Sequence, residues 1–120
     1  MTSINSVTDL EVADGVAVIT LDSPPVNALS ANVRDGLLGA FDAAIADDDV
    51  KAIVLICAGR TFIAGADISE FGGAAKGASL FDVQNKMESS SKPVIAALHG
   101  TALGGGLEVA MCAQIGRAHV

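Results

Sequence analysis

The chain has 120 residues, of which 51% are hydrophobic, and its mean hydropathy is +0.52. This length and composition suit one small domain with a packed core and exclude a disordered chain. A net charge of −7 opposes binding to nucleic-acid backbones or anionic membrane surfaces. The absence of Trp and Tyr leaves almost no aromatic side chains for stacking on bases. A ligand that carries phosphate would therefore need a local basic pocket.

The first predicted element is a β-hairpin. Asp14 and Gly15 separate two strand-like segments, Leu10–Ala13 and Val16–Leu21. This dipeptide is favoured in two-residue hairpin turns because both residues tolerate a positive φ. Ser30 then stands where the N-cap of a following helix is expected.

A helix is predicted over residues 31–46, because apolar residues recur there at steps of three and four. They are Val33, Leu37, Leu38, Phe41, Ala44 and Ile45. Three adjacent carboxylates follow at Asp47, Asp48 and Asp49. They cannot all point inward, so we interpret them as a solvated turn rather than a metal site.

The segment Ala52–Cys57 is apolar at every position, which predicts a parallel strand covered on both faces. The loop at residues 58–67 follows its C-terminal end, the edge where open α/β sheets usually bind ligands. The remaining predicted elements are a short helix over Ile68–Phe71, a glycine-rich connection over Gly72–Gly77, a helix over Leu80–Ser90 and a buried strand over Val94–Leu98.

A glycine-rich turn comes between the last strand and a final helical segment. Gly104, Gly105 and Gly106 precede Leu107 and Glu108. Glycines at a strand-to-helix turn let the backbone approach a ligand, and the free N–H groups of a helix start favour negative charge. Glu108 directly follows these donors, where it could act as a general acid or base.

Two motifs together resemble the enoyl-CoA hydratase/isomerase, or crotonase, family. They are R-T-F-I-A-G-A-D-I-S-E-F at residues 60–71 and K-P-V-I-A-A-L-H-G-T-A-L-G-G-G-L-E-V-A-M at residues 92–111. The resemblance covers Leu10 to Ala113. The G-T-A-L-G-G-G-L-E motif is most similar to the hydratase module of multifunctional fatty-acid oxidation proteins. It implies an α/β crotonase-like (ClpP/crotonase) fold of repeated ββα units, of which residues 1–113 form the N-terminal part.

The resemblance implies an oxyanion hole formed by the backbone N–H groups of Ala66 and Gly105, which would hold the thioester carbonyl of an acyl-CoA. Glu108 matches the first of two catalytic glutamates in the hydratases, and the second would lie beyond residue 120. Further contacts to the coenzyme A thioester are implied for Ala64, Asp67, Ile68 and Gly104.

The implied function is an enoyl-CoA hydratase of fatty-acid β-oxidation that adds water to trans-2-enoyl-CoA. The alternative enzymatic function is a Δ3-Δ2-enoyl-CoA isomerase. The non-enzymatic alternative is an acyl-CoA-binding fragment without turnover. We expect the isolated chain to be inactive. His99, between a buried strand and a turn, is interpreted as a hydrogen-bonded structural residue.

No metal or other cofactor is expected, because coenzyme A is part of the substrate; NAD would enter only with a following dehydrogenase module. Cys57 and Cys112 are interpreted as buried hydrophobic residues. The cations considered for the coenzyme A phosphates are Lys51, Arg60, Lys76, Lys86 and Lys92. No signal peptide or membrane span is visible, so we expect a cytoplasmic protein. The family implies a homo-oligomer, a trimer or hexamer, or a multifunctional complex.

The last segment, residues 114–120, is expected to be non-native. Ile115 to Val120 resembles the translation of ATC GGA AGA GCA CAC GTC, a common sequencing adapter, and the preceding adapter bases would complete the Gln114 codon. We therefore exclude Arg117 and His119 from any role.

Overall fold

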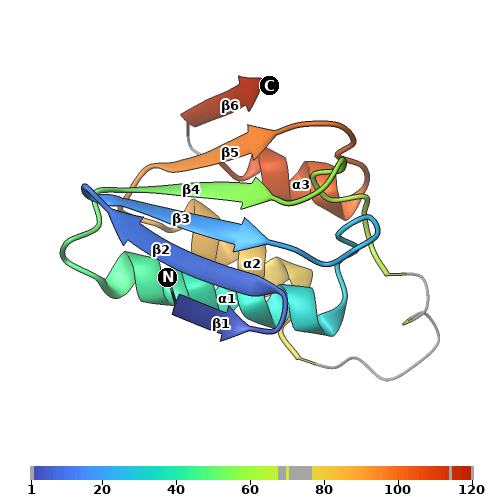
Figure 1. Cartoon of the computed structure of the whole chain (residues 1–120), viewed down its shortest axis with the longest axis horizontal. Coiled ribbons are helices and arrows are strands. Elements are labelled where there is room, and N and C mark those ends of the chain that lie inside the picture. Colours follow the sequence, from blue (N-terminus) through green and yellow to red (C-terminus); the bar gives the residue numbers. More distant parts are fainter. Residues whose placement is uncertain (1, 68–69, 71–76, 114, 120) are drawn as a thin grey trace.

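The computed structural model describes residues 2–67, 70, 77–113 and 115–119, with backbone alone for the last segment. It contains an α/β arrangement of one sheet with helices (Figure 1). The elements in chain order are β1 (Thr2–Asn5), β2 (Thr8–Ala13), β3 (Val16–Leu21), α1 (Ala31–Ala46), β4 (Ala52–Cys57), α2 (Leu80–Glu88), β5 (Val94–Leu98), α3 (Gly105–Met111) and β6 (Ile115–His119).

The strands lie in the sheet in their chain order, β1-β2-β3-β4-β5-β6. β1, β2 and β3 pair antiparallel, whereas β3 to β6 pair parallel. The parallel pairs β3-β4 and β4-β5 are each joined through a helix, as parallel pairing requires a crossover. The carboxyl ends of β3, β4 and β5 therefore meet at one edge, at the right of Figure 1, and the loops that follow them lie together there.

The predicted hairpin is confirmed. Asp14 and Gly15 have φ values of 53° and 82° and connect Ala13 directly to Val16 across the turn. β1 was not predicted from the sequence. Its residues are polar or half-exposed at the edge of the sheet, so they show no alternation that would distinguish a strand.

The first helix begins where its capping residue predicted. The Ser30 hydroxyl accepts a hydrogen bond from the N–H of Val33 at 3.2 Å, which satisfies one of the free donors of the helix start. At the other end, the Lys92 ammonium donates to the carbonyls of Ala44 and Asp47 at 3.0 and 2.6 Å. Lys92 therefore binds the negative end of α1, and its ammonium is engaged there rather than by a ligand.

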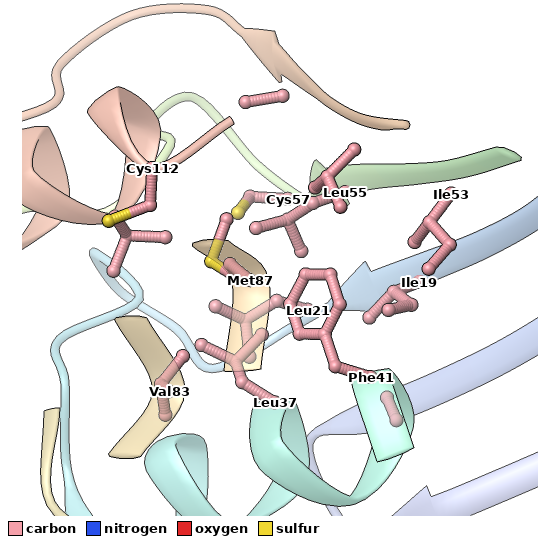
Figure 2. Packing of buried hydrophobic residues seen from close by; sticks show 14 of the residues in the cluster. Ile19, Leu21, Leu37, Phe41, Ile53, Leu55, Cys57, Val83, Met87 and Cys112 are labelled. Carbon is pink, nitrogen blue, oxygen red and sulfur yellow. The ribbon is translucent and has the colours of Figure 1, made fainter. Parts of the chain in front are cut away.

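Helices α1 and α2 pack on one face of the sheet, where the hydrophobic core lies (Figure 2). Ile53, Leu55 and Cys57 of β4 point into this core with Phe41 and Met87 of the helices. Side chains on a strand alternate between faces, so the other β4 residues, Ala52, Val54 and Ile56, lie on the opposite face.

The opposite face of β4 is only half-buried within this chain, whereas the apolar run predicted a strand covered on both faces. Ala52, Val54 and Ile56 are half-buried, in strict alternation with buried neighbours. An apolar run matches a parallel strand, but it does not show how much of each face is covered. β5 shows a similar pattern, because Ile95 and Ala97 are also half-buried.

The helix predicted over Leu80–Ser90 is confirmed as α2, which ends at Glu88. It starts with a capping box in which Ser79 and Asp82 exchange side-chain to backbone hydrogen bonds, both at 3.0 Å. The predicted short helix over Ile68–Phe71 and connection over Gly72–Gly77 lie outside the described residues, apart from Glu70 and Gly77.

In the structure, β6 pairs parallel with β5, and Ile115 lies opposite Ile95. This pairing concerns backbone geometry and gives no information on how residues 114–120 arose. The interpretation of that segment as adapter read-through therefore stays a prediction.

Candidate active site

The loop after β4 is held against two other segments. Ile63 is buried and forms a parallel bridge with Ala102, and its carbonyl accepts the N–H of Leu103 at 3.2 Å. Ala66 forms a second bridge with Leu29, whose N–H donates to the Gly65 carbonyl at 2.8 Å. The loop that carries Ala66 thus lies between the segment before α1 and the segment before α3.

Glycine is favoured at each of the three positions of the turn before α3, for a different physical reason at each. Gly104 is the N-cap residue of α3 and has a φ of 51°, a conformation that favours glycine. A Cβ on Gly105 would come within 2.7 Å of Leu29 Cδ1, and a Cβ on Gly106 would collide with the Ile63 carbonyl oxygen. The helix start can therefore approach the loop after β4 only because these residues lack side chains.

The predicted pair of backbone donors, Ala66 and Gly105, is brought to one place around Leu29. Ala66 is bridged to Leu29, and Gly105 packs directly against its side chain. Within the described ranges, no protein group accepts a hydrogen bond from the N–H of Ala66 or of Gly105. Gly105 is the first residue of α3, so its N–H belongs to the free donors at the positive end of a helix.

Two hollows meet at Ala66. One, of about 280 Å³, is mostly apolar and is lined by Leu29, Arg34, Ala66, Gly77, Ala78, Ser79 and Leu80. The other, of about 450 Å³, is lined by Ser23, Pro24, Pro25, Val26, Ala28, Ser30, Ala66 and Asp67. Ala66 therefore stands between an apolar space and a more polar one.

Glu108 lies in the first turn of α3, where its position after the glycines predicted it, and its side chain is exposed. Its Oε2 accepts a hydrogen bond from Nε2 of Gln84 on α2 at 3.2 Å. One turn further along both helices, the Cys112 thiol donates to Oε1 of Glu88 at 3.2 Å. The Gln84 contact was not predicted, because the two residues are distant in sequence and no motif joins them.

Two other residues that the sequence reasoning missed hold the loops of the site. The Asn27 side chain binds the loop after β4, and the Arg34 guanidinium donates to the carbonyls of Leu29 and Ala78 at 2.6 and 2.7 Å. Arg34 also forms an ion pair with Glu70 at 3.3 Å. The position of Arg34 one turn after a helix N-cap was the available signal, but it indicated only a polar helix face.

The other predicted contacts are placed as follows. The N–H of Ala64 donates to the Val26 carbonyl at 3.2 Å, and Asp67 lines the larger hollow. Ile68 lies outside the described residues, and so does Lys76. His99 makes a ring-nitrogen hydrogen bond to the Gly59 carbonyl at 2.8 Å, as expected for a structural histidine.

Both cysteines are buried, which confirms their interpretation as small core residues. Burial raises the pKa of the Cys57 thiol to about 12. The pKa of Cys112 rises to about 11, first through burial and then through its hydrogen bond to Glu88. Both thiols are therefore neutral near pH 7 and poorly nucleophilic.

Within the described part of the chain, no group of three His, Cys, Asp or Glu residues is arranged to hold a metal ion. The same residues include no helix with the length and apolar character needed to cross a membrane.

The family model described as enoyl-CoA hydratase/isomerase matches residues 11–118, so the chain belongs to the enoyl-CoA hydratase/isomerase family. The peroxisomal bifunctional enzyme of Danio rerio is 43% identical over 108 residues, which cover 90% of this chain and 15% of that protein. A protein of Bacillus subtilis (strain 168) described as "Probable enoyl-CoA hydratase" is 42% identical over 116 residues, covering 88% of this chain and 44% of that protein.

Solved structures show the same fold. A crystal structure described as an enoyl-CoA hydratase/carnithine racemase from Magnetospirillum magneticum superposes with a TM-score of 0.84 at 32% identity. The match covers 96% of this chain and 48% of that one. The expected α/β crotonase-like fold is thereby confirmed, and the chain spans less than half the length of these relatives.

Proposed function

We propose that the chain is part of an enoyl-CoA hydratase that adds water across the double bond of a trans-2-enoyl-CoA. The observation that carries this proposal is the pair of N–H groups of Ala66 and Gly105, which are not used within the described protein and flank Leu29 beside an apolar hollow. A thioester oxygen that develops negative charge is the kind of acceptor such donors suit. Glu108, on the same helix start, supplies a carboxylate.

In this mechanism the two N–H groups bind the thioester oxygen and favour electron flow from the double bond toward it. The oxygen of a water molecule bonds to C3 while a carboxylate takes one proton from the water, the C2–C3 double bond becomes an enolate, and C2 then takes a proton from a carboxyl group. Glu108 exchanges protons with this water, which normally contributes on the order of 10²–10⁴-fold. A second carboxylate, which the resemblance to the hydratases implies for the full-length protein, completes the proton exchange.

The proposal requires no metal or redox group, because the oxygen is stabilised by hydrogen bonds. Coenzyme A is part of the substrate, and NAD would be needed only by a separate dehydrogenase module. The apolar hollow at Leu29, Ala66 and Leu80 suits the acyl chain, and the more polar hollow beside Asp67 suits the coenzyme A moiety.

The family description also covers isomerases, which move a double bond between C3 and C2. The carboxylate next to the helix start favours the hydratase, because Glu108 matches the first of the two glutamates that the hydratases use. Comparing the rates with a trans-2-enoyl-CoA and a 3-enoyl-CoA would separate the two activities. An acyl-CoA-binding protein without turnover would bind both and convert neither.

The test uses the parent protein, by which we mean the full-length gene product that contains residues 1–113. Glu108→Gln retains the volume of the side chain but cannot exchange a proton, so we expect kcat for crotonyl-CoA hydration to fall by roughly 10²-fold or more. Glu11→Gln, an exposed position on β2, is the matched control and should leave the rate unchanged. Hydration at the parent rate by folded Glu108→Gln would refute the assignment.

The remaining proposals concern the cellular setting. The relatives include proteins described as peroxisomal and glyoxysomal, alongside the bacterial one. We propose a cytoplasmic homo-oligomer, or one part of a multifunctional complex, for the parent protein. Size-exclusion chromatography with light scattering would give its oligomeric state.

A further inference from the structure

Helices α2 and α3 exchange two side-chain hydrogen bonds that have the same spacing on both helices. Gln84 contacts Glu108 at 3.2 Å, and Glu88 contacts Cys112 at 3.2 Å. Residues four apart lie on one face of a helix, so these contacts form two successive connections along one helix pair. The first involves the carboxylate that the proposed function uses.

The Gln84 side chain is more buried than the Glu108 side chain. The Gln84 side chain is half-buried, and its helix neighbours Val83 and Met87 are fully buried in the core. Glu108 is exposed and would otherwise have several rotamers available. The hydrogen bond from the Gln84 amide thus joins the exposed Glu108 side chain to a half-buried side chain on a helix that packs in the core.

We propose that Gln84 is the positioning residue for Glu108: its Nε2–H group holds the Glu108 carboxylate in the orientation needed for proton exchange with the attacking water. The inference rests on the proposed function, because it assumes that Glu108 is catalytic. Gln84 itself does not exchange a proton in this scheme, since an amide does not titrate in water.

A residue that orients a catalytic group affects the chemical step more than substrate binding. Gln84→Met has nearly the same length and similar helix propensity but no hydrogen-bond donor. In the parent protein we expect kcat for crotonyl-CoA hydration to fall about tenfold, with KM within about twofold of the parent value. Gln84→Glu also keeps the side-chain shape but places a like charge beside Glu108, so its kcat should fall further.

Asn85→Met is the matched control. It makes the same kind of change at the next position of α2, where the side chain is exposed. Its kcat and KM should equal those of the parent protein.

A double-mutant cycle distinguishes positioning from a general structural effect. In a Glu108→Gln background the oriented group no longer exchanges protons, so adding Gln84→Met should change the residual rate by less than about twofold. Circular dichroism checks that each variant is folded, and Gln84→Glu takes the place of Gln84→Met if the latter does not fold.

Two results would overturn the inference, and they have different consequences. The first result is that Glu108→Gln removes activity while Gln84→Met and Gln84→Glu keep the parent kcat, or that Gln84→Met lowers kcat by the same factor in the parent protein and in the Glu108→Gln variant. In either case Gln84 does not act through Glu108. The proposed function would stand. If folded Glu108→Gln hydrates at the parent rate, the proposed function and the inference both fail.

Discussion

The most informative perturbation of the fold is at Asn27, which connects the loop before α1 to the loop after β4. Its side chain is almost fully buried, and its backbone has a φ of 52°. The amide nitrogen Nδ2 donates to the carbonyls of Ala58, Thr61 and Phe62 at 3.0, 2.9 and 3.1 Å. Its Oδ1 accepts the N–H of Ser23 at 2.7 Å.

Asn27→Ala removes all four contacts and leaves a residue that disfavours the left-handed backbone. The fully buried contact, to Phe62, leaves a carbonyl without a partner, which costs about 1–3 kcal/mol. Water can reach the part-buried contacts, and their loss costs about 1 kcal/mol together. The backbone conformation adds about 1 kcal/mol for Ala. We therefore expect the free energy of unfolding to fall by about 4 kcal/mol.

Asn27→Gly separates the two causes, because glycine adopts a positive φ without strain. It should destabilise the protein by about 1 kcal/mol less than Asn27→Ala. Urea denaturation of the parent protein, followed by far-ultraviolet circular dichroism, measures both changes. A loss below about 1 kcal/mol for Asn27→Ala would refute the reasoning, since one orphaned buried carbonyl alone should cost that much.

Gly105→Pro should abolish turnover in the parent protein, because proline removes the proposed N–H donor; a folded variant with the parent rate would exclude that donor. Residues 1–120 expressed alone should not hydrate crotonyl-CoA and should melt without a sharp transition, because one sheet face stays half-exposed; parent-like turnover would contradict this. The raised pKa of Cys57 means that the unfolded thiol ionises first as pH rises, so stability should hold below pH ~9 and then fall by about 1 kcal/mol per pH unit toward pH 12. A Cys57→Ala variant should lack that fall.

The sequence predicted those features that depend on local chemistry. The Asp14-Gly15 turn, the Ser30 cap and the strand-glycine-helix unit ending at Glu108 all lie where they were expected. Each follows from neighbouring residues, whose backbone preferences or side-chain hydrogen bonds act over one turn.

The features that were missed depend on contacts between distant segments. Asn27 binds residues 31 to 35 positions away, and Gln84 contacts Glu108 across 24 positions. Nothing in the local pattern around either residue indicates its partner. The half-buried second face of β4 could not be predicted from its residues either, because an apolar run shows which residues tolerate burial and not what packs on them.

The consecutive strand order has a consequence for how the site comes into being. Every strand pairs with its neighbour in the sequence, so the sheet can extend strand by strand as the polypeptide leaves the ribosome. Ala66 follows β4, whereas Gly105 and Glu108 follow β5. Parallel pairing of β4 with β5 must therefore form before the loop that carries Ala66 meets the loop that carries Gly105. Such pairing between segments distant in sequence is typically slow to form. An acyl-CoA that binds both loops would then stabilise the late, assembled state and not the hairpin that forms first.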